Sequence, residues 1–189
     1  DTKSVILYVA KLRQACIELM EARIAEREAE RLAAIAAERA KARALTQEKV
    51  DTLESAASGL RKWCKDKEKS FKDPVASGEL AGGVDLDDLR KRLGEIKEFR
   101  TSQKPPRAQE KQALAGLHAA LESRLAGAAA DAAASEAEPP SQEYMAKLKA
   151  AMEVASPEAL QTAWTAMEAA EHASEAALPL RIETREKEV

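Results

Sequence analysis

Aromatic residues, glycine and proline are all scarce in this sequence. Aromatics make up only 3% of the residues, and glycine and proline occur seven times each. Strands are built from runs of β-branched and aromatic residues, and no such run is present. Charged residues make up 33% and alanine supplies much of the 45% hydrophobic content, which is typical of long helices with narrow apolar seams. The sequence therefore predicts an all-α fold, with one domain, or one domain and an appendage, in 189 residues.

Long apolar runs and concentrated positive charge are missing as well. No run approaches the ~20 residues that a membrane span requires, and no secretory signal pattern is present. The net charge is −3, and lysine and arginine are interleaved with glutamate, whereas a phosphate-binding surface needs a concentrated basic face. We therefore expect no membrane span and no nucleic-acid partner.

The residue types that carry catalysis or bind metals are few and widely separated. Cys16 and Cys64 form no CxxC or histidine-rich motif and are typical of reduced thiols in a cytosolic protein. The two histidines, His118 and His172, lie near no cysteine or acidic pair at ligand spacing, and His118 lies beside a leucine seam. The glycines and aspartates of residues 78–88 complete neither a phosphate loop nor an EF-hand. The sequence predicts no enzyme, no cofactor and no metal site.

Two apolar stripes on either side of a double proline organise the rest of the chain. Their spacings alternate between three and four residues, so each stripe lies on one face of a helix. Because a seam of this length needs cover on more than one side, we expect a central helix flanked by two others. A proline costs ~3 kcal/mol in a helix interior, so the helix should break or kink between Thr101 and Pro106, with Ser102 or Lys104 as the new cap. The stripes are Leu86, Leu89, Leu93 and Ile96, then Leu114, Leu117, Leu121 and Leu125.

Two further segments carry seams that suit the flanking helices. The first, residues 48–72, has heptad spacing and is expected to end at Asp73-Pro74. The second, residues 157–178, begins with Ser156 as N-cap and Pro157 in the first position, and Pro179 should end or kink it. Gly127 should stop the central helix. The predicted core residues are Leu60, Trp63, Leu93, Ile96, Leu121 and Trp164, with the two tryptophans packed across the bundle.

The first 45 residues divide into an apolar part and a polar part. Residues 19–47 are charged and alanine-rich, with only a thin apolar seam, as in a helical neck. Residues 1–18 carry more large apolar side chains than a solvent-exposed helix tolerates. Burying each such side chain is worth ~1.5–3 kcal/mol, so we expect self-association through residues 1–45. The candidate residues are Val5, Ile6, Val9, Leu12, Ile17 and Met20.

Several motifs resemble the alpha-actinin family. The segment LGEIKEFRTSQKPPRAQEK is similar to the second helix of the first spectrin-type repeat in the alpha-actinin rod. The opening DTKSVILYV resembles the last helix of a second calponin-homology domain, and Leu60 with Trp63 and Ala163 with Trp164 resemble the first and third helices of the repeat. Ser70 departs from the family, which has a second tryptophan there, so Phe71 should fill the space. The matching positions are Asp1, Lys3, Ser4, Val5, Tyr8 and Val9, then Leu93, Glu95, Phe99, Arg100, Lys104-Pro105-Pro106 and Gln109-Glu110-Lys111.

The resemblance implies a domain organisation. Residues 1–18 would be the terminal helix of a calponin-homology domain, 19–47 the neck, and 48–189 a spectrin-like repeat. In the repeat, the helices would cover 48–72, 86–126 (broken near 101–106) and 157–178. The family has a shorter connection before its third helix, so residues 128–155 would be an insertion. The chain starts without methionine and stops within a helical pattern, so we expect a piece of a longer protein.

The resemblance also implies a function. The chain would be a cytoplasmic, cytoskeletal rod segment of an actin crosslinker, acting as a spacer and pairing with itself as an antiparallel homodimer. It would reach F-actin only through the calponin-homology domains that it lacks. The alternative is a helical scaffold, or a bundle that opens onto a lipid surface. Tryptophans shielded from a quencher favour the rod, and tryptophans exposed on adding lipid vesicles favour the alternative.

Overall fold

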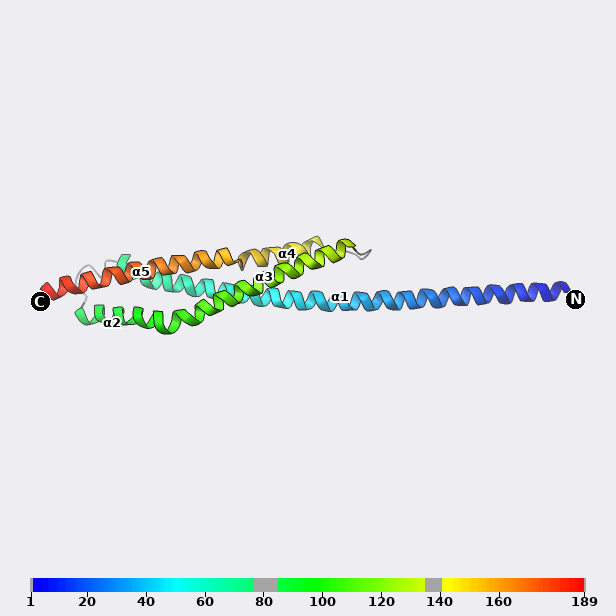
Figure 1. The fold of residues 1–189 in the computed structure, drawn as a ribbon, viewed down its shortest axis with the longest axis horizontal. Helices are drawn as coiled ribbons and strands as arrows, with labels where there is room; N and C mark the ends of the chain where they lie inside the picture. Colours follow the sequence, from blue (N-terminus) through cyan, green and yellow to red (C-terminus); the bar gives the residue numbers. More distant parts are fainter. Residues whose placement is uncertain (1, 77–84, 135–140, 189) are drawn as a thin grey trace. The chain divides into compact units, whose positions relative to one another are not determined.

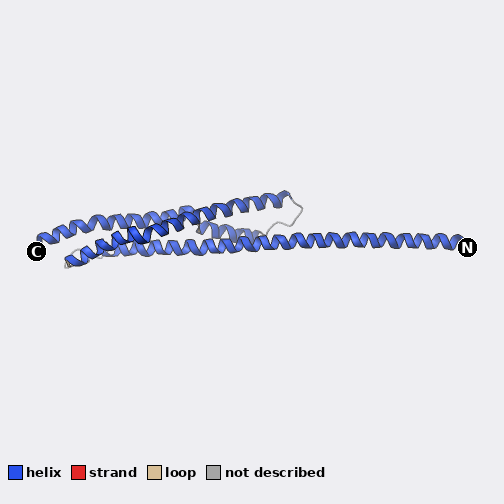
Figure 2. Ribbon diagram, turned by 60° about the horizontal axis from the view of Figure 1, so that its bottom comes forward, coloured by secondary structure: helices blue, strands red, loops and turns tan. Residues whose placement is uncertain are grey.

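All the regular structure in the described part of the chain is helical. A computed structural model describes residues 2–76, 85–134 and 141–188. Figure 1 shows the order of the elements, and Figure 2 shows only helices among them. They are α1 (Thr2–Ala76), α2 (Leu86–Glu98), a π-helical turn η1 (Phe99–Gln103), α3 (Lys104–Ala134), α4 (Gln142–Val154) and α5 (Pro157–Glu188). The all-α prediction is confirmed.

The chain divides into two compact units, residues 1–47 and 48–189. The second unit is a three-helix bundle, as predicted. We call its three long components helix A (residues 48–76 of α1), helix B (α2, η1 and α3 in series) and helix C (α4 and α5 in series). Figure 1 shows α5 alongside α2 and the end of α1 that belongs to this unit. The first unit is the remaining part of α1, and each unit is described separately below.

Apolar side chains from all three long helices form one core. Helix A contributes a heptad row with steps of three and four residues, as the sequence predicted. Phe71 is buried in this core, and its ring meets that of Phe99 edge-on with the centroids 5.1 Å apart. The buried residues include Val50, Leu53, Ala57, Leu60 and Cys64 of helix A, Leu89, Ile96, Phe99, Leu114 and Leu121 of helix B, and Leu148, Met152, Leu160, Trp164, Met167 and Leu178 of helix C.

Helix B does not stop at the double proline. Instead the chain passes through the π-turn η1 and continues directly into α3, with a change of direction that Figure 1 shows between α2 and α3. The wider turn closes with a bond from the Lys104 N–H to the Phe99 carbonyl. Ser102 does not cap a new helix, because its hydroxyl donates back to the Glu98 carbonyl at 2.6 Å. Pro105 and Pro106 then follow in the first turn of α3, and because helix B is continuous there, they supply no N–H donors to the carbonyls of the preceding turn.

The π-turn also keeps the seam positions before and after it on the same face of helix B. Positions 89, 93, 96 and 100 face the bundle, and positions 104, 107, 111 and 114 continue the seam. The steps alternate between four and three residues except across η1, where two steps of four follow each other. One extra residue would rotate the second half of a regular helix away from its partners. A π-turn absorbs that residue and keeps both halves in contact with helix C.

Gly127 does not end helix B, because α3 continues to Ala134. A glycine costs about 1 kcal/mol relative to alanine inside a helix, and the alanines on both sides restore the helical preference. Residues 142–154 form α4, which is part of the bundle, since Leu148 and Met152 are buried in its core. The described portion of the 128–155 segment therefore lengthens helices B and C.

The two flanking helices also extend beyond their predicted ends. Helix A reaches Ala76, past Pro74. Helix C continues through Pro179 to Glu188, although the proline leaves the Glu175 carbonyl without its usual donor. Packing compensates, because Leu178 is buried and Ile182 lies against the core. An ion pair of 2.8 Å between Arg90 and Glu186 ties the last turns of α5 to α2.

The helix starts follow the predicted chemistry in part. Ser156 precedes α5 and accepts a bond from the Ala159 N–H at 3.2 Å, and Ser141 caps α4 by accepting from the Tyr144 N–H at 3.2 Å. Asp85 occupies the N-cap position of α2, but its side chain makes no capping bond. The sequence also favours Val84 as a hydrophobic staple before α2, but Val84 and the turn that joins helices A and B lie outside the described residues.

Candidate functional site

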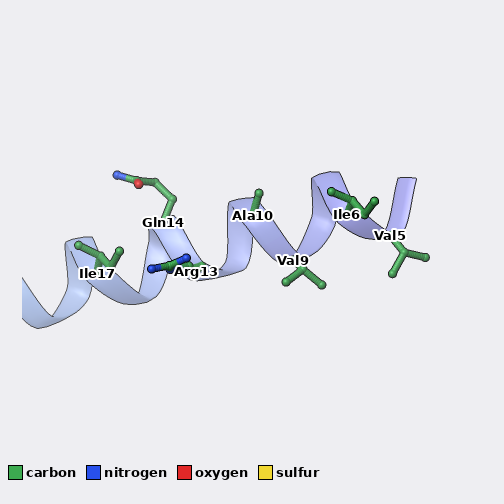
Figure 3. Close-up of a pocket in the computed structure, with 7 residues that line it drawn as sticks. All are labelled: Val5, Ile6, Val9, Ala10, Arg13, Gln14 and Ile17. Carbon is green, nitrogen blue, oxygen red and sulfur yellow. The ribbon is translucent and has the colours of Figure 1, made fainter. Parts of the chain in front are cut away.

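The first unit presents an apolar helix surface to solvent. The predicted self-association residues are all exposed, from 40% for Ile17 to 64% for Ile6 and Met20. Contiguous exposed apolar surface of this kind marks interaction sites in soluble proteins. Figure 3 shows part of this surface, with Val5 and Val9 along one edge of the helix and Ile6 and Ala10 along the other. The remaining exposed large apolar residues of this unit are Leu7, Tyr8, Leu19, Ile24, Leu32, Ile35 and Leu45.

The surface wraps around more than one face of the helix. Val5, Val9, Leu12 and Cys16 follow steps of four and three residues and so form one stripe. Ile6, Ala10, Arg13 and Ile17 form a second stripe beside it, and these residues line a shallow groove. A stripe of three- and four-residue steps is the shape that a second helix covers. The first unit can therefore associate along its length with another helix.

A cluster of partly buried charged side chains lies between helices B and C, around one fully buried glutamate. Glu171 of helix C is completely buried, and both of its carboxylate oxygens are used. Arg100 of η1 donates from Nε to Glu171 Oε1 and from Nη1 to Glu175. Lys104 donates to Glu171 Oε2 at 2.8 Å and also pairs with Glu168 at 3.0 Å. We call Arg100, Lys104, Glu168, Glu171 and Glu175 the ionic cluster.

Aromatic rings and cations surround this cluster. Trp63 of helix A stacks on Phe99 with the ring centroids 5.7 Å apart, and it meets Trp164 of helix C at 6.2 Å. Arg107 lies 5.5 Å from the centre of the Trp63 ring, and Lys111 lies 4.8 Å from that of Trp164. Such cation–π contacts are worth about 0.5–2 kcal/mol each, depending on exposure. Four successive seam positions of helix B, 100, 104, 107 and 111, therefore carry cations where the rest of the seam carries apolar residues.

Hydrogen bonding decides the charge state of the ionic cluster. Burial raises the pKa of Glu171, but the bonds from Lys104 and Arg100 lower it further than burial raises it, so its pKa lies below the ordinary value. Burial lowers the pKa of Lys104, yet its bonds to Glu171 and Glu168 raise it overall. The bonds to Glu171 and Glu175 raise the pKa of Arg100 in the same way. Glu171, Lys104 and Arg100 are therefore all ionised at neutral pH.

Glu171→Gln is expected to lower the free energy of unfolding by about 1–3 kcal/mol at pH 7, because it removes a buried partner from two cations. Since the folded-state pKa of Glu171 lies below the unfolded value, the carboxylate stabilises the fold above the ordinary glutamate pKa of about 4.5. That contribution is lost as the pH falls through the lowered folded-state pKa. Urea titrations should therefore show a difference in the free energy of unfolding between the wild type and the variant at pH 7, and a smaller difference in acid.

The matched control is Glu143→Gln, since Glu143 pairs with Lys147 at 2.9 Å in an exposed i,i+4 geometry. Exposed pairs contribute about 0–1 kcal/mol, so this variant should remain close to the wild type at both pH values. A difference between Glu171→Gln and the wild type that did not change with pH would contradict the assigned ionisation.

The surroundings of Cys64 and His118 indicate that both side chains stabilise the fold. Burial raises the pKa of the Cys64 thiol to about 11, although Lys111 and Arg107 lower it, so the thiol is un-ionised at neutral pH. His118 is buried, and its Nε2 lies 3.1 Å from the Met152 carbonyl. Because a carbonyl can only accept, Nε2 carries the proton and donates to the C-terminal end of α4. Arg61 of helix A donates to the neighbouring Val154 carbonyl at 3.2 Å, so two side chains hold this end of α4 against the bundle.

The structure brings the predicted core residues together in the bundle. Leu60, Ile96, Leu121 and Trp164 are buried, and Trp63 and Leu93 are partly buried against them. The sequence reasoning missed the ionic cluster. A signal for it was present, since helix C places Glu168, Glu171 and Glu175 at helical spacing opposite the charged seam positions of helix B.

Within the described ranges, no group of three or more histidine, cysteine or acidic side chains is placed to hold a metal ion. None of the helices searched there is long and apolar enough to cross a membrane. Comparison of the chain with protein-family models, curated proteins and solved structures finds no match. Proposals about function therefore rest on the fold, the exposed surface of the first unit and the motifs of the sequence.

Proposed function

We propose that this chain is a rod segment of an alpha-actinin-like actin-crosslinking protein, and that it acts as a spacer and self-association element. The observation that carries the proposal is a three-helix bundle preceded by helical residues with exposed apolar side chains. The motifs around Lys104-Pro105-Pro106 and the two tryptophans support the same family. In this proposal the bundle sets distance, and the first unit makes contact with a second copy.

Bundles of long helices suit a spacer for a physical reason. Each residue of an α-helix advances about 1.5 Å along the axis. Three long helices packed together therefore hold the two ends of the bundle far apart, as a spacer must. The seams of the bundle are buried inside, and among its described residues the exposed large apolar side chains are Val154 and Leu180. The exposed apolar residues are concentrated in the first unit, which favours that unit as the contact.

The alternative is a scaffold whose helices open onto a lipid surface. The exposed apolar stripes of the first unit are compatible with lipid as well as with a helix partner. Tryptophan fluorescence separates the two, because Trp63 and Trp164 belong to the closed core. Unchanged emission and unchanged quenching on addition of anionic vesicles favour the rod, and a red shift with faster quenching favours the lipid-surface bundle.

A pair of fusion proteins tests the crosslinking role. One joins an actin-binding calponin-homology pair to the full chain, and the other joins the same pair to residues 48–189. Both should pellet with F-actin at high speed, because both carry the actin-binding head. Only the first should bundle filaments and pellet them at low speed, because only it can pair through the first unit.

The unfused chain is the control for this experiment and should remain in the supernatant with F-actin. Tight binding of actin by the unfused chain would contradict the spacer role. Equal bundling by the two fusions would contradict the assignment of self-association to the first unit.

A further inference from the structure

Three features that weaken a helix coincide in helix B. The backbone forms a π-turn at Phe99–Gln103, and the hydrogen bonds of π-turns are less regular than those of an α-helix. Pro105 and Pro106 follow at once and supply no N–H donors. In the same turn, side-chain hydroxyls bond to backbone carbonyls one turn earlier, since Thr101 donates to the Lys97 carbonyl at 3.0 Å and Ser102 donates to that of Glu98 at 2.6 Å. Such bonds compete with the regular backbone bonds and often bend a helix.

The seam that faces helix C carries charges instead of apolar side chains at this level, while Phe99 packs on Trp63 and Phe71 of helix A. On one side Leu89 and Ile96 are buried, and on the other Leu114 and Leu121 are buried. Between them the seam positions after Phe99 are cations. Ionic and cation–π contacts depend on geometry more steeply than apolar burial does, so a small displacement of this segment removes its contacts sooner than those of the leucine-packed ends.

Helices A and C are continuous where helix B is interrupted. α1 runs without a break to Ala76, and α5 runs without a break from Pro157. The ionic cluster joins the interrupted segment to α5 through Arg100 and Lys104, and both cations meet on the buried Glu171. On the side of helix A, Lys67 lies 5.5 Å from the centre of the Phe99 ring.

We infer that residues 99–106 of helix B form a hinge, and that Glu171 holds it closed by binding Arg100 and Lys104 together. The hinge opens locally, separating residues 99–111 from helix C while the leucine-packed parts of helix B remain in place. This inference goes beyond the proposed function and does not depend on it. In a rod, such a hinge supplies a defined point at which the bundle bends.

Native-state hydrogen exchange of the full chain tests the hinge. Peptides covering 86–98, 99–111 and 114–125 are followed by mass spectrometry at pH 7, and protection factors are compared. The 99–111 peptide is expected to be less protected than 114–125 by about tenfold, because local opening needs less free energy than global unfolding. Glu171→Gln should lower the protection of 99–111 about tenfold further, because local opening already breaks the bonds to Glu171. Low concentrations of urea should lower the protection of 114–125, which exchanges through global unfolding, and leave that of 99–111 nearly unchanged, because local opening exposes little surface. Glu143→Gln should change neither.

A second variant tests the hinge in the opposite direction. In Arg100→Leu/Glu171→Leu the buried pair is replaced by apolar side chains, which is often neutral or stabilising. The protection of 99–111 should then rise to that of the leucine-packed segments. The inference is overturned if the protection of all three peptides falls equally with urea, which indicates one cooperative unit, or if the double leucine variant lowers the protection of 99–111.

Discussion

Replacing Trp164 with alanine is expected to lower the free energy of unfolding by about 4 kcal/mol, in the range for large aromatic residues removed from a core. Only 5% of this residue is exposed, so the substitution leaves a cavity that rigid helices cannot close. It also removes the ring contact with Trp63 and the cation–π contact with Lys111.

Trp63→Ala should cost somewhat less, about 3 kcal/mol, because Trp63 is only partly buried and Arg107 covers its outer face. Urea denaturation followed by circular dichroism measures both changes, since the variants alter the fluorescence signal itself. Leu180→Ala is the matched control, because Leu180 is 67% exposed and surface substitutions stay within about 0.5 kcal/mol. A Trp63→Ala variant as stable as that control would place Trp63 on the surface and break the assignment of helix A.

Periodicity was sufficient to predict the architecture of the bundle. The heptad row from Val50 to Cys64 and the two leucine stripes each define one face of a helix, and burial of those faces requires three helices together. The spacing of these residues alone is sufficient to predict helix A and the two halves of helix B. Fold class depends on the repeated spacing of many residues, so single exceptions do not change it.

Helix ends were predicted less well, because each rests on one or two residues. Gly127 and Pro179 are helix breakers by intrinsic preference, but the helices continue through both. Packing of Leu178 and Ile182 exceeds the cost of one lost backbone bond at Pro179. The double proline was identified as a site of disturbance, yet its outcome was a π-turn, which depends on the phase of the seam on both sides and not on the prolines alone.

The ionic cluster was missed because charged residues on helices usually face solvent. Arg100, Lys104 and Glu171 look like ordinary surface residues when each helix is considered alone. Only the pairing of helices B and C shows that the cations continue an apolar seam and that Glu171 faces them. A search of the seam positions for charges, with opposite charges at matching positions of the partner helix, would have identified it.

The full chain is expected to self-associate, which would double the molecular mass measured in solution. The exposed residues include Val5, Val9 and Leu12, and burial of each is worth ~1.5–3 kcal/mol. In the proposed rod, antiparallel pairing would spread over several repeats, and one repeat would offer only part of that interface. The first unit should therefore dominate, with two helices lying side by side.

Substitutions within the stripe should weaken this association. Leu12→Lys introduces a charge into the stripe of Val5, Val9 and Cys16, and desolvating that charge opposes pairing. Ser4→Lys is the matched control, because it adds the same charge outside that stripe. The Leu12→Lys chain should remain monomeric up to a higher protein concentration than the wild type does, and the Ser4→Lys chain should dimerise like the wild type.

The measurement that tests this account most directly is the mass in solution of two chains, by sedimentation equilibrium or light scattering from micromolar to millimolar concentration. The full chain should have twice its 20.5 kDa mass. A chain that begins at Ala44 should be monomeric and retain the helical circular dichroism of the bundle. A full chain that stays monomeric throughout this range, or a shortened chain that still dimerises, would contradict the assignment of self-association to residues 1–45.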